Sequence, residues 1–413
     1  MNGWITQEIR QLGKVVTGKT PPTMDLDYYN GNELFVSPKD LDYDAYFIRE
    51  TQTQITQKAL EKFKNQLLPK NSIMFTSLSF AFGKIGISSR PSLTNQQINS
   101  IIINGSNYYK FIYYLLQIYR PIIFSFNSGI DTPIVIKSVF EKIEVKVPKR
   151  KIHQKKIAAI LSAYDDLIEN NKRRIALLEK MAEEIYREWF VRFRFPGHEK
   201  VKFVKGVPEG WSIQKIENIV GEIRKGISRK SLIGTEKYIG LEHIPRKSIS
   251  IKDYTTTDSI ESNKLIFKRQ DILFSKIRPY LHKVALAHFD GVCSSDTIIL
   301  RAKNENYIGF LLFTVFSESF IELATIASKG TKMPRADWDF LKKLELKIPT
   351  DNLLKQYQKI FDGFFSQIEK LLLSNEILTL CRDSLLPRLI SDKLSVEDLD
   401  IQFPPNMQTE EET

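Results

Sequence analysis

The stretch ILSAYDDLIENNKRRIALLEKMAEEIYREWF, from Ile160 to Phe190, determines how the rest of the sequence is interpreted. It contains no Gly and no Pro, and apolar residues recur through it with heptad spacing, so it predicts one long helix. Because this helix lies in the middle of a chain of 413 residues, we expect it to connect separate globular parts. Its seam comprises Ile157, Leu161, Tyr164, Ile168, Asn171, Ile175, Leu178, Ala182, Ile185 and Trp189, with Asn171 as the one polar break.

A second helical pattern with the same spacing lies near the C-terminus. Its seam comprises Tyr357, Phe361, Phe364, Ile368, Leu371, Asn375, Leu378, Arg382, Leu385 and Leu389, and we interpret Arg382 as a weakening of the seam toward its end. Two matching seams in one chain favour an antiparallel coiled coil, whereas the alternative is that each helix packs on its own globular block. Asn171 and Asn375 either pair and fix the register of the coiled coil, or lie at a solvated edge.

The two blocks that precede these helices resemble each other at five places in the same order. GWITQEIRQL at Gly3 matches GWSIQKIENI at Gly210, and SIMFTS at Ser72 matches DILFSK at Asp271. GIDTP at Gly129 matches GTKMP at Gly330, VKVP ending at Pro148 matches LKIP ending at Pro349, and each of these prolines is followed by a Gln, Gln154 or Gln356. Five ordered matches indicate a duplicated unit of roughly 200 residues, in which a block is followed by a helix. The motif-like residues Trp4, Trp211, Phe75 and Phe274 are assigned to core packing.

We therefore predict an α+β fold with a pseudo-two-fold internal repeat: two similar globular domains separated by two long helices. The predicted boundaries are 1–150 for the first domain, 151–200 for the first helical region, 201–350 for the second domain and 351–390 for the second helical region. Residues 391–413, which include EDLDIQFPPNMQTEEET, form an acidic tail that we expect to be poorly ordered.

Composition and charge narrow the class of protein. The net charge is +11, and it divides into +6 for residues 1–150, +5 for 151–205, +6 for 206–349 and −6 for 350–413. Basic blocks of this kind favour a nucleic-acid partner. Two cysteines provide neither a disulfide framework nor a zinc site, and no apolar run is long enough to span a membrane or serve as a signal peptide. We expect a cytoplasmic protein.

Several motifs together resemble the specificity (S) subunits of type I restriction–modification systems. They are VTGKTPP at Val16, FVSPKDL at Phe35, DILFSKIRPYLHKVALA at Asp271, the Gly-x-x-x-Pro turns at Gly129 and Gly330, and the first long helix with its flanks, QKKIAAILSAYDDLIENNKRRIALLEKMAEEIYREWFVRFRFPG. The resemblance covers about residues 1–390. The second helical region is less similar to the first than a strict repeat predicts, which leaves open whether both helical regions offer equivalent docking surfaces.

The resemblance implies a subunit without catalytic activity of its own. Each recognition domain would read one half of a bipartite site in double-stranded DNA, and the helices would set the unread spacer. The helices would also dock two methyltransferase subunits, which carry S-adenosylmethionine, and the complex would include restriction subunits that use ATP and magnesium. No cofactor is expected on this chain.

A direct search for catalytic motifs favours the same interpretation. Neither Pro-Pro site, at Pro21 and Pro404, fits the Asn/Asp-Pro-Pro-aromatic motif of adenine methyltransferases, and no P-loop or metal-ligand spacing occurs. Asp165 and Asp166 are interpreted as a solvated helix face. The main alternative is a stand-alone nuclease or DNA methyltransferase with an unrecognised site, and another is a structural coiled-coil hairpin with basic ends.

Candidate DNA contacts are basic and amide side chains in loops, because Lys and Arg bind phosphates while Arg, Asn and Gln read base edges. In the first block these are Lys19, Thr20, Lys39, Ser79, Lys84, Gln96 and Gln97. In the second they are Lys225, Arg229, Lys276, Arg278, Tyr280, Ser294, Ser295, Lys329, Lys332 and Arg335, where Ser294 and Ser295 are aligned with Gln96 and Gln97. Any one of these could instead be an ordinary solvated surface residue.

Overall fold

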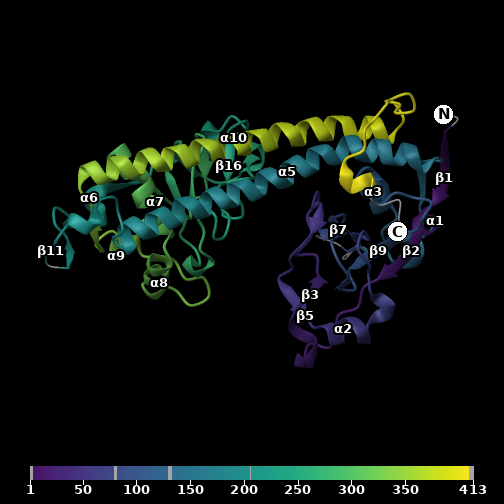
Figure 1. Cartoon of the computed structure of the whole chain (residues 1–413), viewed down its shortest axis with the longest axis horizontal. Coiled ribbons are helices and arrows are strands. Elements are labelled where there is room, and N and C mark those ends of the chain that lie inside the picture. Colours follow the sequence, from purple (N-terminus) through teal and green to yellow (C-terminus); the bar gives the residue numbers. More distant parts are fainter. Residues whose placement is uncertain (1–2, 79–80, 129–132, 205, 409–413) are drawn as a thin grey trace. The chain divides into compact units, whose positions relative to one another are not determined.

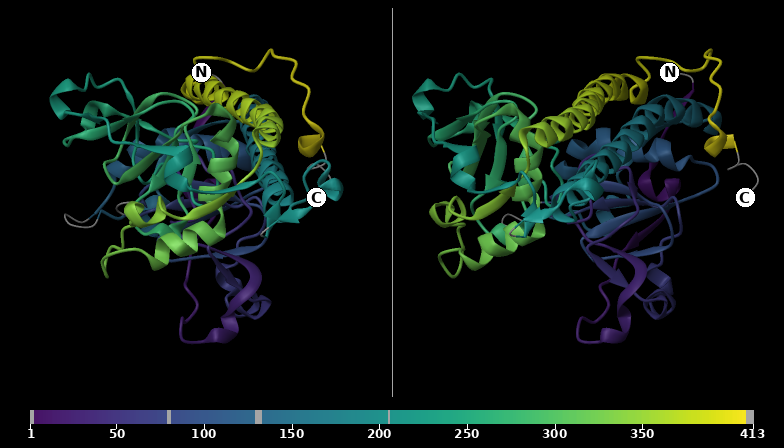
Figure 2. Two further views of the ribbon diagram at one scale, coloured as in Figure 1. Left: turned by 90° about the vertical axis from the view of Figure 1, so that its left-hand side faces the viewer. Right: turned by 60° about the vertical axis from the view of Figure 1, so that its left-hand side comes forward.

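The computed structural model of the chain describes residues 3–78, 81–128, 133–204 and 206–408 (Figure 1). The chain divides into two compact units: unit 1 comprises Met1–Ile168 with Ile377–Thr413, and unit 2 comprises Glu169–Glu376. Two long helices, α5 (Lys151–Tyr186) and α10 (Asp351–Ile390), contribute to both units. Within each unit, a segment of α5 lies beside a segment of α10 (Figures 1 and 2).

Unit 1 is built on a five-stranded sheet with the order β2 (Gly13–Thr17), β9 (Ile98–Ile103), β6 (Ile73–Thr76), β7 (Ile85–Ser88) and β4 (Phe47–Ile48). A three-stranded sheet contains β5 (Thr53–Ile55), β3 (Tyr29–Val36) and β8 (Ser92–Thr94), and β1 (Trp4–Glu8) pairs with β10 (Glu144–Pro148). The helices are α1 (Ile9–Leu12), α2 (Gln57–Lys62), α3 (Tyr109–Ser125), α4 (Lys137–Phe140) and α11 (Pro405–Gln408).

Unit 2 has a four-stranded sheet with the order β14 (Val220–Ile223), β22 (Thr297–Ala302), β19 (Ile272–Ser275) and β20 (Val284–Leu286). A five-stranded sheet contains β15 (Gly226–Ile227), β18 (Lys264–Phe267), β21 (Gly291–Cys293), β16 (Lys237–Ile239) and β17 (Thr255–Thr256). Strand β13 (Ser212–Lys215) pairs with β23 (Glu345–Ile348), and β11 (Phe203–Val204) with β12 (Val207–Pro208). The helices are α6 (Ile216–Ile219), α7 (Ile308–Phe316), α8 (Glu318–Ile326) and α9 (Trp338–Leu341), and the π-helical turn η4 (Arg187–Val191) extends α5.

An inner strand of each main sheet contributes to two hydrophobic cores, one shared with a helix and one shared with the second sheet. In β6, Ile73 and Phe75 point into the core that contains α3, whereas Met74 points to the opposite face. In β19, Phe274 likewise joins the core that contains α7, and Leu273 joins the core of the other sheet. Side chains alternate between the faces of a strand, so a continuous apolar run buries both faces.

The internal repeat is confirmed by matched contacts in the two units. Gln154 of α5 accepts the backbone N–H of Tyr108 at 2.9 Å, and Gln358 of α10 accepts that of Gly309 at 2.9 Å. Gln356, which the sequence comparison matched with Gln154, is exposed, so that match is wrong by two residues. In both units a glutamine side chain accepts a backbone N–H at the start of the equivalent helix, α3 or α7. This shared contact makes Gln358 the counterpart of Gln154.

The long helices combine both packing arrangements considered from the sequence. Every predicted seam residue of α5 and α10 is buried or half-buried, and this set includes Ile157, Leu161, Tyr164, Ile168, Leu178, Phe361, Phe364, Ile368 and Leu371. Helix packs on helix where Ile175 of α5 contacts Ile368, Leu371 and Leu372 of α10. Elsewhere each helix buries its seam against a globular core, as Leu161 does in unit 1 and Phe361 does in unit 2.

The two seam asparagines contact each other within unit 2. The Asn171 side-chain amide donates to the side-chain oxygen Oδ1 of Asn375 at 2.9 Å, and Asn171 is 7% exposed. Because a buried amide is stable only with a partner, this pair favours one register of α5 against α10. The predicted pairing of the two asparagines is confirmed over the solvated-edge alternative.

The interpretation of Asp165 as a solvated residue is wrong. Asp165 is 3% exposed, and its carboxylate accepts a hydrogen bond from Arg382 of α10 at 2.5 Å and another from the Tyr114 hydroxyl of α3. Arg382, which looked like the weakening end of the seam, is also only 3% exposed. Burial raises the pKa of Asp165, although Arg382 and Tyr114 oppose that rise. Arg382, the charged residue at a seam position, therefore belongs to a buried ion pair.

The C-terminal segment also differs from the expectation of a poorly ordered tail. Val396 and Met407 are buried in the unit 1 core, and Ile401 and Phe403 pack against it. Apolar residues spaced through an otherwise acidic stretch anchor the segment up to residue 408. Among the helices of the described residues, none alone is long and apolar enough to cross a membrane; only Glu305–Phe316 with Glu318–Ile326, bent by 60°, meets that criterion as a pair.

Candidate nucleic-acid interface

The topology of unit 1 brings several predicted contact loops to one edge of its main sheet. Strand β2 ends where β9 begins, with Thr17 opposite Asn99, and β6 ends at the same place, with Thr76 opposite Ile98. Asn95, which precedes β9, donates its backbone N–H to Val36 at the end of β3 at 3.0 Å. The loops that follow β2, β3 and β6 therefore gather beside the loop that precedes β9.

The loop after β2 approaches the loop before β9 closely. Gly18 lies against the backbone there, and a Cβ at this position would be 2.2 Å from the Asn95 carbonyl oxygen. The Thr20 hydroxyl donates to the Gln96 side-chain oxygen at 2.8 Å, and Lys19 is exposed, with its ammonium 5.7 Å from the Phe63 ring. The structure thus brings Lys19, Thr20 and Gln96 together, as a cation, a hydroxyl and an amide on one exposed surface.

The other unit 1 candidates have more varied surroundings. Lys39 is exposed in the turn after β3, whereas Gln97 is half-buried and accepts the Ser77 N–H with its backbone carbonyl at 2.9 Å. Lys84 is half-buried and donates to the Leu41 carbonyl oxygen at 3.1 Å. Lys283 of unit 2 donates to the Leu241 carbonyl oxygen in the same way. This repeated contact gives both lysines a role in holding a loop. Ser79 lies outside the described residues.

In unit 2, three predicted residues line one depression of about 290 Å³: Lys276, Lys329 and Arg335. The Lys329 ammonium lies 2.6 Å from the Asp337 carboxylate, and hydrogen bonding to Lys329 lowers the pKa of Asp337. Arg335 lies 3.7 Å from Asp296. These exposed ion pairs contribute little to stability, so the cations are available to a polyanion at small cost.

The turn beside this depression has a strained backbone. Arg278 is exposed at φ 50°, and its N–H donates to the Pro334 carbonyl oxygen at 2.7 Å. Tyr280 follows with 53% of its surface exposed, and Gly330 at φ 96° occupies a conformation that favours glycine. Turn geometry therefore explains Gly330, whereas Gly129 lies outside the described residues.

Three further unit 2 candidates lie outside this depression. Lys225, Arg229 and Lys332 are exposed, but none of them lines the depression. The Lys225 carbonyl accepts the N–H of Ile266 at 2.8 Å, beside the five-stranded sheet. Arg224, which the sequence analysis did not select, does line the depression. The offset of 207 that relates Trp4 to Trp211 also relates Arg224 to Thr17 at the end of β2, which was not a candidate contact, so the repeat did not identify Arg224.

The alignment of Ser294 and Ser295 with Gln96 and Gln97 is wrong by one residue. Ser294 donates its N–H to the end of β16, as Asn95 does to the end of β3, and Asp296 accepts the Lys276 N–H as Gln97 accepts that of Ser77. Ser295 is therefore the counterpart of Gln96, and both are exposed. The two units therefore place different side chains, an amide and a hydroxyl, at the same loop position.

These loops offer cations for phosphate and amides or hydroxyls for base edges. Among the residues that the structure describes, no group of three or more His, Cys, Asp or Glu side chains could hold a metal ion.

Comparison with known proteins places the chain among related sequences and structures. The sequence model described as the type I restriction modification DNA specificity domain matches residues 1–180 and 208–379. The type I restriction enzyme MjaIX specificity subunit of Methanocaldococcus jannaschii is 26% identical over 412 residues, which cover 96% of this chain and 94% of the relative. The EcoDI specificity subunit of Escherichia coli is 24% identical and covers 86% and 79%, respectively. The crystal structure of a type I system S subunit from M. genitalium matches with a TM-score of 0.56 at 16% identity over 94% of this chain and 96% of that one, so it supports the fold.

Proposed function

The chain belongs to the family of type I restriction–modification DNA specificity proteins, and on this premise we propose that its two units each read one half of a bipartite site in duplex DNA. The observation that carries the proposal is the repeated sheet edge. Each unit has an exposed lysine in the loop after an edge strand of its main sheet, Lys19 after β2 and Lys225 after β14, and a different polar side chain at an equivalent loop position, Gln96 in unit 1 and Ser295 in unit 2. Basic side chains position a protein on the phosphate backbone, and variable polar side chains distinguish bases.

The helices would set the unread spacer between the half-sites. Helix α5 contains 36 residues. At ~1.5 Å per residue it spans roughly 54 Å, or about one and a half turns of B-DNA. The Asn171–Asn375 hydrogen bond favours one register of the helix pair, so a slip of one heptad, which would change the spacer, is disfavoured.

The chemistry would belong to partner subunits. We infer that the helices dock two methyltransferase subunits that bind S-adenosylmethionine, and that restriction subunits supply the ATP- and magnesium-dependent steps. Helix α5 leaves Leu177 and Met181 61% and 53% exposed, one turn apart, as expected of a face that binds another protein. This chain would contribute recognition and spacing, without a catalytic step of its own.

Co-purification tests this proposal. A tagged chain is recovered from its own host, the proteins bound to it are identified by mass spectrometry, and the host's methylated DNA motif is sequenced. We expect a DNA methyltransferase at about two copies per chain and a motif of two short parts with a fixed gap. A chain that purifies alone and by itself cuts or methylates DNA would contradict the proposal.

A further inference from the structure

The turn that joins the two larger sheets of unit 2 is fixed to helix α10 by a bidentate ion pair. This turn, residues 268–271, follows β18 of the five-stranded sheet and precedes β19 of the four-stranded sheet. The Arg269 guanidinium donates from Nε and Nη2 to the two carboxylate oxygens of Glu369, at 2.8 and 2.9 Å. The guanidinium carbon lies 5.8 Å from the centre of the Phe365 ring. Two parallel hydrogen bonds fix direction as well as distance, so the turn has one preferred orientation on the helix.

The backbone of this turn is itself held firmly. Gln270 has φ 70°, in the left-handed region. The Arg269 backbone N–H donates to the Asp290 carboxylate at 2.7 Å, and the Lys268 N–H donates to the Asp271 carboxylate at 2.7 Å. Asp271 is 1% exposed. Because the turn is rigid and continuous with both sheets, a movement of the turn on α10 would move both sheets.

A second polar contact lies on the same face of α10. Tyr254, directly before β17, donates its hydroxyl to the Glu376 carboxylate at 2.6 Å. Glu376 follows Glu369 by seven residues, which is about two helical turns. The hydrophobic core of the five-stranded sheet contains no residue of α5 or α10 among those that the structure describes. These polar contacts therefore hold the five-stranded sheet on α10, whereas the four-stranded sheet shares an apolar core with that helix.

Contact loops of unit 2 lie at the other end of the strands that meet at this turn. Strand β19 runs from the turn toward Lys276, and β18 begins after Asn263, whose side-chain oxygen accepts the Arg229 backbone N–H at 3.2 Å. Each strand has four residues, which at ~3.3 Å per residue places these loops roughly 13 Å from the turn. A tilt of about 15° at the turn would therefore move the loops by about 3.4 Å, which is the rise of one base pair in B-DNA.

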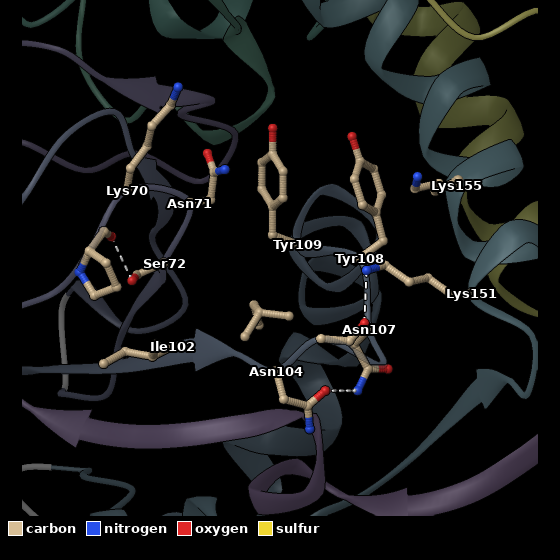
Figure 3. A pocket seen from close by; sticks show the side chains of 13 residues that line it. Lys70, Asn71, Ser72, Ile102, Asn104, Asn107, Tyr108, Tyr109, Lys151 and Lys155 are labelled. Carbon is tan, nitrogen blue, oxygen red and sulfur yellow. Dashed lines mark hydrogen bonds between the residues drawn. The ribbon is translucent and has the colours of Figure 1, made fainter. Parts of the chain in front are cut away.

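Unit 1 repeats the turn but not the two residues of the ion pair. By strand register, Lys70 takes the place of Arg269. Asp165 of α5 takes the place of Glu369, since each lies eleven residues after the equivalent glutamine, and Arg382 binds Asp165 instead. In unit 1 a pocket of about 260 Å³ lies between the turn and the first turns of α5 (Figure 3). The ion pair is thus a property of the unit 2 side chains that the fold alone does not require.

We propose that Arg269 and Tyr254, with Glu369 and Glu376, form a brace that positions the contact loops of unit 2, so that the chain accepts one length of unread gap. This inference rests on the proposed function, in which each unit reads one half-site. It adds residues that control spacing and leave base choice to the loops. All four are positioning residues, because they act on the loops from the far end of the strands.

The test measures discrimination of gap length by the full chain with its co-purifying methyltransferase. Competition binding compares a duplex carrying the selected site with duplexes whose gap is one base pair shorter or longer. Glu369→Gln combined with Tyr254→Phe removes both contacts with little change in shape. We expect the preference for the selected gap to fall about fivefold or more, while the preferred bases of both half-sites stay the same. The effect is moderate because the Arg269 side chain is 48% exposed.

The matched control is Glu318→Gln. It breaks the Lys247–Glu318 ion pair of the same unit, which is also 2.9 Å long, is exposed and involves neither long helix. The control should leave the gap preference unchanged. Thermal melting of both variants separates positioning from stability, since a loss of stability alone weakens binding to every duplex by the same factor.

Three results would overturn the brace: a double variant with the gap preference of the unaltered chain, a double variant that loses the preferred bases of the unit 2 half-site, or a control that loses the gap preference to the same extent. An unaltered chain that selects one continuous sequence would contradict the proposed function itself. The failure of the brace and the failure of the proposed function are therefore distinguishable in the same experiment.

Discussion

Replacing Asp165 by Asn tests the buried ion pair that joins α5, α10 and α3 in unit 1. The substitution preserves the shape of the side chain but leaves the Arg382 guanidinium, which is 3% exposed, without its main counterion. Removing one partner of a buried pair costs about 3–5 kcal/mol. Asp383 at 2.9 Å and Asp44 at 3.5 Å stay near the guanidinium, but both side chains are more than half exposed. They compensate only in part, so we expect a loss near the lower limit, about 3 kcal/mol in the free energy of unfolding.

Urea denaturation at pH 7 measures this change. The control is Glu169→Gln, which removes an exposed pair with Lys172 at 3.2 Å and costs less than about 1 kcal/mol. Replacing Arg382 by Met together with Asp165→Asn removes both buried charges, so the double variant recovers most of the lost stability. A cost for Asp165→Asn no larger than that of Glu169→Gln would refute the reasoning. A double variant whose loss equals the sum of the two single losses would refute the coupling.

Three further predictions concern single side chains. Asn171→Leu leaves the Asn375 amide without its partner and costs about 1–2 kcal/mol in urea denaturation, whereas replacing both by Leu restores stability. Gly18→Ala places a methyl group 2.2 Å from a carbonyl oxygen and destabilises the protein by about 2 kcal/mol or more, while Gly105→Ala, which meets nothing within 4 Å, is close to neutral; thermal melting of the two variants compares them. Burial lowers the pKa of His288 from 6.5 to about 4, so the unfolded chain binds this proton first and stability falls as the pH decreases between those values. We expect unfolding at pH 5 to require about 2 kcal/mol less than at pH 7.5, and His288→Gln to flatten that difference.

The heptad seams could be predicted from sequence because side-chain spacing on a helix is a local property. The charged residues that the two helices bury could not be predicted in this way. Asp165 and Arg382 are 217 residues apart, and nothing near either one in the sequence indicates the partner that makes its burial tolerable. In the sequence alone, a charged residue at a seam position such as Arg382 cannot be distinguished from the point at which the apolar pattern ends, because its counterion is not visible.

The candidate interface was predictable as a set of loops and less so as individual residues. The match of Ser72 with Asp271 located the loop around Lys276, and that of Gly129 with Gly330 located the loop around Lys329, whereas the loop around Lys19 lies in the motif VTGKTPP. The structure places Lys19 after the end of β2 and Lys276 after the end of β19. The equivalence of Gln96 with Ser295 needed backbone hydrogen bonds, because a shift of one residue in a short loop leaves no trace in its composition. The role of Lys84 could not be predicted either, because the sequence does not distinguish a lysine that donates to a loop carbonyl from a lysine that faces solvent.

Selection of bound duplexes from a random library, with the chain and its co-purifying methyltransferase, tests the central claim most directly. We predict two short preferred sequences separated by a constant unread gap. Substituting Lys276 and Arg335 by Gln in unit 2 should weaken the preference for one part only, and substituting Thr20 and Gln96 by Ala should weaken the preference for the other, since each base contact supplies about 1–3 kcal/mol of discrimination. A single continuous preferred sequence, or the loss of both parts in either variant, would contradict the assignment of one half-site to each unit.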